Sequence, residues 1–220
     1  MSSSENPTRR PLDTRLSEAL QRDEILQPTK LGVPAKEFII AERRGEASRI
    51  CSGVYLGASH PKTTWTELAG WTVRYPDAVA CLLTSARFHG LIPEPNKGKD
   101  PECWVFLPWE QIRYAPAHLR VIGVPLHEIP PSQDDAQGLG IVETTVHGCQ
   151  IRYTDADRTC VDLLRYHDRR AVELPLETAQ TALRSRIAQP GFDRQKFISF
   201  AERIGSWNRI LPLASSILSL

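Results

Sequence analysis

The sequence predicts an α+β fold, because helical patterns come first, short strands follow them, and helices return at the end. The helical stretches carry apolar residues at three- and four-residue spacing. The predicted strands are short apolar runs bounded by prolines or turn residues. Of the 220 residues, 41% are hydrophobic and 24% are charged, which is the composition of a globular protein. A chain of this length is long enough for two small domains.

The first part of the chain is predicted to be a disordered tail followed by three short helices. Residues 1–13 are rich in Ser, Asn, Pro and Arg, and segments of this kind bury too little apolar surface to fold. Helices are expected from Arg15 to about Arg22, from Pro28 to about Leu31 and from Pro34 to Arg44, because proline suits the first turn of a helix. The tight turn Gly32-Val33-Pro34 separates the second helix from the third.

A hairpin is predicted directly after the third helix, which Gly45 ends. Its strands are Ala47–Ile50 and Val54–Leu56, and its turn is Cys51-Ser52-Gly53. A helix that is held by a turn and flanked by a two-stranded wing fits the major groove of duplex DNA. Residues 14–58 are therefore predicted to form a winged helix-turn-helix domain.

A second domain, with a mixed α+β fold and a helical tail, is predicted for residues 63–220, after a linker at Gly57–Lys62. Helices are expected at Trp65–Thr72 and at Pro76–His89. The predicted strands are Cys103–Leu107, Leu119–Val124, Ile141–Val146 and Cys149–Tyr153. The first predicted helix of the tail is capped by Thr154 or Asp155 and reaches about Tyr166. The others run from Leu174-Pro175 to about Ile187, from a cap at Asp193 to just before Gly205, and from Trp207 to Leu218.

Composition and motifs exclude several classes of protein. No apolar run approaches the roughly 20 residues that a membrane span needs, and the polar N-terminus lacks the apolar core of a signal peptide. A cytoplasmic protein without a membrane anchor is therefore expected. Five scattered cysteines, without the close spacing of zinc ligands, indicate reduced thiols and no metal site. No phosphate-binding loop or G-x-G-x-x-G motif occurs in the sequence, so no cofactor is expected.

The chain is not expected to be an enzyme. Ser85 and His89 lie four residues apart on a predicted helix, but a nucleophile and its base also need an orienting acid and an oxyanion site. The sequence offers neither in register. A histidine at the negative end of a helix dipole is the ordinary interpretation, and no catalytic residue is assigned.

One face of the third predicted helix is the best candidate for contact with DNA. Lys36, Ile40 and Arg43 share this face, and it points outward if Phe38 anchors the helix to the core, with Ile39 between the two faces. Arginine pairs with guanine or phosphate, and an exposed isoleucine contacts thymine methyl groups. Two alternatives stay open: a solvated face held by Glu–Arg pairs, and a slightly rotated helix that buries both Ile39 and Ile40. The residues expected to contact DNA are Lys30, Lys36, Ile40, Arg43, Arg44 and Arg49.

Four segments, in this order and spacing, resemble a known family. They are GVPAKEFIIAERRGEASRICSGVYLG (32–57), YPDAVACLLTSARFHGL (75–91), CWVFLP (103–108) and IVETTVHGCQIRYTDADRTCVDLLRYH (141–167). Together with the helical tail, they are similar to the AbiEi family, the antitoxin half of abortive-infection (type IV) toxin–antitoxin systems, which act in antiviral defence.

This resemblance implies a winged helix-turn-helix and a larger α+β domain. It also implies a repressor that binds double-stranded DNA at its own operator and counteracts a toxin with a nucleotidyltransferase fold. By position, Pro34–Arg44 would be the recognition helix and Ala47–Leu56 the wing. Arg158, Thr159 and Asp162 match the R-T-x-x-D signature of the family's second domain. From their spacing alone, Arg158 and Asp162 are expected to form a surface or half-buried ion pair on a helix.

Two other functions stay open. A protein-interaction module without DNA binding is favoured by the nearly balanced charge of residues 1–60, which hold nine Lys/Arg and eight Asp/Glu, and by Ile39 and Ile40. A nuclease is the less favoured alternative, because the sequence has no cluster of metal-binding carboxylates.

Overall fold

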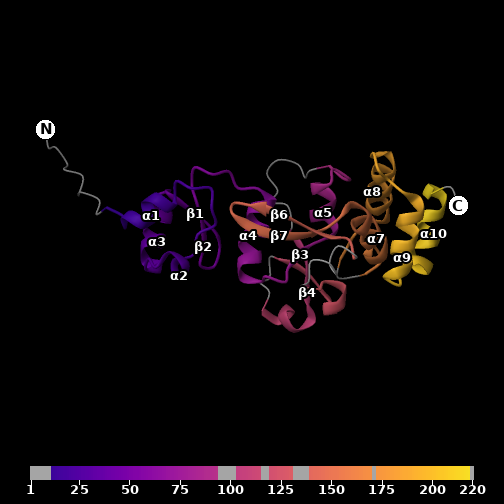
Figure 1. Ribbon diagram of the computed structural model, residues 1–220, viewed down its shortest axis with the longest axis horizontal. Coiled ribbons are helices and arrows are strands. Elements are labelled where there is room, and N and C mark those ends of the chain that lie inside the picture. Colours follow the sequence, from indigo (N-terminus) through magenta and orange to yellow (C-terminus); the bar gives the residue numbers. More distant parts are fainter. Residues whose placement is uncertain (1–10, 94–102, 115–118, 131–138, 170–171, 219–220) are drawn as a thin grey trace. The chain divides into compact units, whose positions relative to one another are not determined.

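The computed structural model describes residues 11–93, 103–114, 119–130, 139–169 and 172–218 (Figure 1). Within these residues the protein is a mixed α+β chain with nine α-helices and two sheets, so the α+β class predicted from the sequence is confirmed. The chain divides into two compact units. The first unit is Met1–Val73 with Val146–Cys149, and the second unit is Arg74–Thr145 with Gln150–Leu220. Most of the predicted disordered tail, residues 1–10, lies outside the described residues.

Three short helices open the first unit, near the positions that the sequence predicts. Helix α1 (Thr14–Ala19) begins after Asp13, whose carboxylate accepts a hydrogen bond from the Arg15 backbone N–H at 2.9 Å. Helix α2 (Pro28–Leu31) has its proline in the first turn and ends at Gly32, whose φ of 65° suits glycine. Helix α3 (Ala35–Arg43) begins after Pro34, which stands at its N-cap.

A two-stranded sheet follows α3. Strands β1 (Ala47–Cys51) and β2 (Val54–Gly57) are antiparallel, with Arg49 opposite Tyr55. The predicted hairpin is therefore confirmed. On its other side Tyr55 forms an antiparallel bridge to Leu26, through backbone hydrogen bonds of 2.8 and 2.9 Å. This bridge ties the segment before α2 to the hairpin.

The core of the first unit is small and apolar, and the Phe38 and Tyr55 rings meet in it with centroids 4.9 Å apart. Its buried members are Leu16, Ala19, Leu20, Leu26, Val33, Phe38, Ala41, Ala47 and Tyr55. Helix α4 (Thr64–Arg74) also belongs to this unit as far as Val73, whereas the sequence prediction places its residues in the second domain. Gly70 of α4 lets the helix approach β1, because a Cβ there would lie 2.5 Å from Ile50 Cγ2.

The second unit contains a mixed five-stranded sheet in the order β5-β4-β3-β7-β6. Strand β3 pairs antiparallel with β4 and parallel with β7, and β4 pairs parallel with β5. The strands are β3 (Val79–Ala80), β4 (Trp104–Pro108), β5 (Arg120–Val124), β6 (Ile141–Val146) and β7 (Cys149–Thr154). The four predicted strands are confirmed.

The helix predicted over Pro76–His89 is wrong in its first half. Val79 and Ala80 form the central strand β3, and helix α5 (Leu82–Phe88) begins only after Cys81. A central strand is buried on both faces, so its residues are apolar without alternation. A run of this kind cannot be distinguished from a buried helix by periodicity.

Helices complete the second unit as predicted. Helix α7 (Ala156–Tyr166) packs against α5, α8, α9 and α10 and lies at the centre of the helical layer. Asp155 caps α7 by accepting the Arg158 backbone N–H at 2.7 Å. The remaining elements are α8 (Leu176–Ala188), α9 (Arg194–Arg203), α10 (Trp207–Leu218) and two 3₁₀ helices, Trp109–Tyr114 and Leu126–Glu128. None of the described helices is long and apolar enough to cross a membrane.

Candidate functional site

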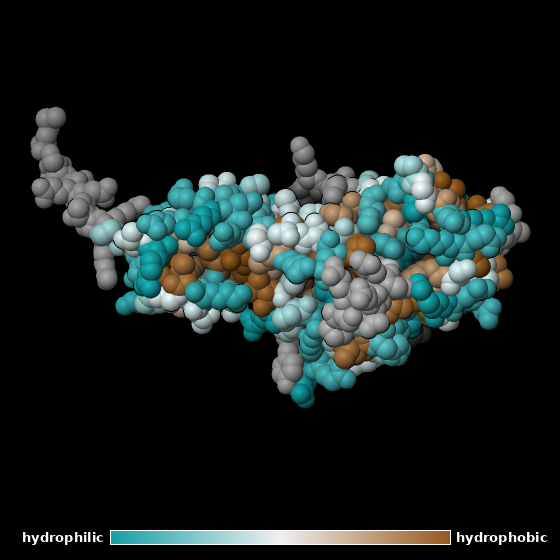
Figure 2. All heavy atoms as spheres, viewed as in Figure 1, coloured by the Kyte–Doolittle hydropathy of each residue, from teal (hydrophilic) through white to brown (hydrophobic). Residues whose placement is uncertain are grey.

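Helix α3 buries one side and exposes the other. Phe38 and Ala41 are completely buried, whereas Lys36 and Arg43 are exposed. Ile39 is 37% exposed, whereas Ile40 is half-buried. The outward face therefore exposes Ile39 more than Ile40, which was the isoleucine expected there. In the view of Figure 2, hydrophobic residues gather over the part of the first unit where Figure 1 shows α3 and the hairpin, with hydrophilic residues around them. The outward face therefore combines cations with apolar surface.

The other predicted contact residues lie on α2, at the end of α3 and on β1. Lys30, in the last turn of α2, is exposed, and Arg44, at the C-cap of α3, is half-buried. Within the described part of the chain, Lys30, Lys36 and Arg43 form no ion pair. Arg49 of β1 differs, because its Nη2 donates to Glu42 Oε2 at 2.7 Å.

A Thr–His–Asp arrangement that the sequence did not reveal lies in the first unit. Thr66 Oγ1 is 2.7 Å from His147 Nε2, and His147 Nδ1 is hydrogen-bonded to Asp23. The order hydroxyl, imidazole, carboxylate is that of a catalytic triad. Thr66, however, is 1% exposed, and it exchanges cap hydrogen bonds with Thr63 at 3.0 and 3.2 Å at the start of α4. The arrangement therefore holds the turn 146–149 in place and leaves no access for a substrate.

Ser85 and His89 bind main-chain groups and not each other. Ser85 Oγ donates to the Ala80 carbonyl at 2.9 Å, and His89 Nε2 is hydrogen-bonded to the Thr154 carbonyl at 2.8 Å. Burial lowers the pKa of His89, which favours the neutral ring in the folded protein. Both side chains therefore fasten α5 to the neighbouring strands.

The residues of the R-T-x-x-D signature are buried, so the expectation of a surface or half-buried Arg158–Asp162 pair is wrong. Both side chains have 0% exposure, and Arg158 Nε donates to Asp162 Oδ2 at 2.7 Å. Arg158 Nη1 also donates to the Leu139 carbonyl at 2.8 Å. Thr159 Oγ1 lies 2.8 Å from Thr154 Oγ1 and ties the start of α7 to the end of β7. The signature is therefore a structural one.

A second pair extends this buried network. Arg165 donates to both carboxylate oxygens of Glu128 at 2.8 and 3.1 Å. Burial raises the pKa of Glu128, but the hydrogen bond and charge of Arg165 outweigh burial and hold that pKa below its usual value. Burial raises the pKa of Asp162 against the opposing effect of Arg158. The network thus alternates two arginines with two carboxylates, of which Arg158 and Asp162 are fully buried and Arg165 and Glu128 are partly exposed.

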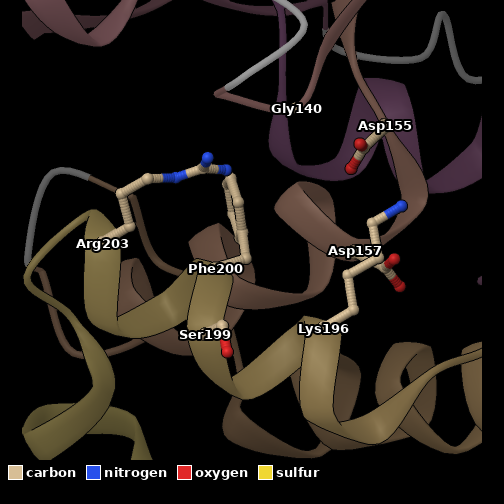
Figure 3. Close-up of a pocket in the computed structure, with 7 residues that line it drawn as sticks. All are labelled: Gly140, Asp155, Asp157, Lys196, Ser199, Phe200 and Arg203. Carbon is tan, nitrogen blue, oxygen red and sulfur yellow. The ribbon is translucent and has the colours of Figure 1, made fainter.

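A cavity of about 350 Å³ lies beside α9 in the second unit. It is lined by Asp155 and Asp157 on one side and by Lys196, Ser199, Phe200 and Arg203 of α9 on the other. Figure 3 shows Lys196 reaching toward the two aspartates. Asp157 is engaged by Arg186 at 2.7 Å, and burial raises the pKa of Asp155. The cavity is thus lined by two carboxylates and two cationic side chains.

The described residues contain no cluster of metal-binding side chains and no disulfide. No group of three His, Cys, Asp or Glu side chains there could hold a metal ion. All five cysteines are free thiols, and Cys149 alone among them is not fully buried.

Comparison with known proteins gives no family. No protein-family model matches the chain, and no curated protein matches it either. Among solved structures, the chain is similar to the RV2827C protein from Mycobacterium tuberculosis, with 15% sequence identity and a TM-score of 0.46. The similarity covers 94% of this chain and 82% of that chain. A similarity of this degree supports no argument about function.

Proposed function

We propose that the protein is a DNA-binding antitoxin of the AbiEi type that represses its own operon. The observation that carries the DNA-binding part is the outward face of α3. This face presents Lys36, Ile39 and Arg43, while Phe38 and Ala41 fix the opposite face in the core. Two cations flanking an apolar residue suit a duplex, which offers phosphates and thymine methyl groups within one major groove.

The surrounding elements support a winged helix-turn-helix. Three helices precede a two-stranded hairpin, and α2 and α3 are separated only by Gly32, Val33 and Pro34. The Leu26–Tyr55 bridge connects the hairpin to the segment before α2. In this proposal α3 is the recognition helix and β1–β2 is the wing.

The few cations must supply most of the affinity, because residues 1–60 carry nearly balanced charge. Arg43 can donate two parallel hydrogen bonds to guanine or phosphate, whereas Lys36 acts as a mobile point charge. In this proposal Lys30 contacts a backbone phosphate only. Affinity is therefore expected to fall as salt is added, with a log–log slope of about −0.9 for each phosphate that these cations contact.

The test is binding to a duplex taken from the DNA upstream of the protein's own gene, measured by gel mobility shift. The double variant Lys36→Ala/Arg43→Ala should bind about tenfold or more weakly, and its salt slope should be shallower by roughly 1 to 2. The control Arg184→Ala/Arg209→Ala removes the same charge from α8 and α10 and should bind as the unchanged protein does. Salt-insensitive binding, or equal loss in both double variants, contradicts the proposed interface.

The antitoxin part is tested separately by co-expression with the adjacent gene. A nucleotidyltransferase-fold toxin encoded there should arrest growth alone and be harmless beside this protein. Neutralisation is assigned to the second unit, so the Lys36→Ala/Arg43→Ala variant should still neutralise the toxin. A neighbour that is harmless on its own removes the antitoxin part of the proposal and leaves DNA binding untouched.

A protein-interaction module is the second candidate, and the 37% exposure of Ile39 favours it. An apolar side chain at the centre of the α3 face also suits a protein partner. A stable partner that co-purifies with the chain and is lost on Ile39→Ala, without any binding of the upstream duplex, would select this function.

A further inference from the structure

The wing cation Arg49 is already engaged by a carboxylate of α3. Its Nη2 lies 2.7 Å from Glu42 Oε2, and its guanidinium lies 5.6 Å from the centre of the Tyr55 ring. The Arg49 carbonyl also accepts a hydrogen bond from Lys62 Nζ at 3.0 Å. Arg49 is thus held beside the last turn of α3.

The strand residue beneath this pair, Tyr55, is packed into the core of the first unit. Tyr55 packs on Phe38 with ring centroids 4.9 Å apart, and both are buried. The backbone of Tyr55 is bonded to β1 on one side and to Leu26 on the other. The guanidinium can therefore change its partner without movement of the strand that carries it.

The ion pair itself is only half-buried, because the side chains of Arg49 and Glu42 are 44% and 34% exposed. A pair of this exposure contributes little, since solvent screens it. A phosphate oxygen offers the same guanidinium a charge-assisted hydrogen bond of the same kind. Glu42 also adds a negative charge within a few ångströms of the place where a phosphate would have to lie.

We infer that Glu42 is a built-in competitor of the DNA backbone for Arg49, and that this competition sets the affinity of the interface. The inference rests on the proposed function. Without DNA, Arg49 is bound to the Glu42 carboxylate; when a duplex occupies the α3 face, a phosphate must displace that carboxylate. The pair thereby lowers non-specific affinity and leaves discrimination to Lys36 and Arg43 on α3.

The experiment measures fluorescence anisotropy of a labelled duplex from the gene's own upstream DNA, with a duplex of scrambled sequence in parallel. Glu42→Gln should tighten binding to both duplexes by about two- to fivefold, which corresponds to an exposed ion pair. The salt slope should steepen by up to about 0.9, because in the unchanged protein the released Glu42 carboxylate takes up a cation that offsets one of those freed from the DNA, and glutamine does not. Glu46→Gln is the matched control, since Glu46 is an exposed acid just after α3 and forms no ion pair in the described part of the chain.

Measuring Glu42→Gln in a protein that also carries Arg49→Ala separates two effects of Glu42: competition with a phosphate for Arg49, and direct repulsion of the DNA phosphates. If Glu42 acts through Arg49, the gain from Glu42→Gln should disappear in Glu42→Gln/Arg49→Ala. Equal gains from Glu42→Gln and Glu46→Gln, or a gain that persists without Arg49, would overturn the inference. Weaker binding by Glu42→Gln would also overturn it, because Glu42 would then position Arg49 for DNA. If the unchanged protein and every variant fail to bind, the proposed function fails instead; circular dichroism of each variant confirms folding.

Discussion

Replacing Arg158 with methionine should destabilise the protein more than almost any other single change of an arginine. Arg158 is completely buried and donates at 2.7 Å to Asp162, which is also completely buried, and at 2.8 Å to the Leu139 carbonyl. Arg158→Met fills much of the same volume but leaves the Asp162 carboxylate without its hydrogen-bonded partner. Removing one member of a buried ion pair costs about 3–5 kcal/mol of unfolding free energy.

The assay is urea unfolding at pH 7, followed by far-ultraviolet circular dichroism. With a slope of about 2–3 kcal/mol per molar urea, the midpoint should fall by about 1–2 M. Arg184→Met is the matched control, because Arg184 is exposed on α8, and it should change stability by less than about 0.5 kcal/mol.

The double variant Arg158→Met/Asp162→Leu makes the reasoning refutable. An apolar pair of similar volume replaces a buried ion pair at little cost, so the double variant should recover most of the stability lost by Arg158→Met. A double variant as unstable as the single one, or a single variant that costs less than about 1 kcal/mol, would refute the argument from the uncompensated charge.

Three further predictions concern stability and reactivity. Gly140→Ala should lower the unfolding free energy by about 3 kcal/mol, because φ is 66° and the added Cβ would lie 2.8 Å from Arg158 Cβ. Gly205→Ala, with φ 67° and open space around the added Cβ, should lower it by about 1 kcal/mol in the same urea assay. Burial lowers the pKa of His89 below its usual 6.5, so the unfolded chain takes up the proton at a higher pH than the folded protein does. The unfolding free energy should therefore fall as the pH drops below about 6.5, and it should level off below the pKa of His89 in the folded protein. His89→Gln should flatten this pH dependence. Cys149 alone should react with a thiol reagent in the folded protein, and slowly, because partial burial raises its pKa; rapid labelling of several thiols in native conditions would contradict the buried placement of the others.

Local sequence signals account for much of the fold. Proline at the first turn, aspartate at the N-cap and glycine after the last turn place the helices near Pro28, Asp155 and Gly45 within a few residues, because each acts on adjacent backbone groups. Strand β3 escaped prediction because Val79 and Ala80 are paired by β4 and β7, which lie far along the chain. Pairing of this kind leaves no local pattern.

The candidate site also has features that the sequence predicts and features that it does not. The outward direction of Lys36 and Arg43 follows from the burial of Phe38, two residues after Lys36, and of Ala41, two residues before Arg43, and helical periodicity is enough to predict it. The engagement of Arg49 by Glu42 depends on a turn that brings strand and helix together, and spacing along the sequence does not encode it. The full burial of Arg158 likewise depends on the four helices that surround α7.

The turn Val146–Cys149 counts as part of the first unit although more than seventy residues separate it from the rest of that unit. His147 accepts the Ile25 backbone N–H at 2.9 Å through its carbonyl and binds Thr66 and Asp23 through its ring. A truncated protein that stops at Val73 therefore lacks a tetrapeptide that its own hydrogen bonding requires. A single cut after Val73 would underestimate the stability of the first unit, whereas a truncated protein to which the turn Val146–Cys149 is joined should recover that stability.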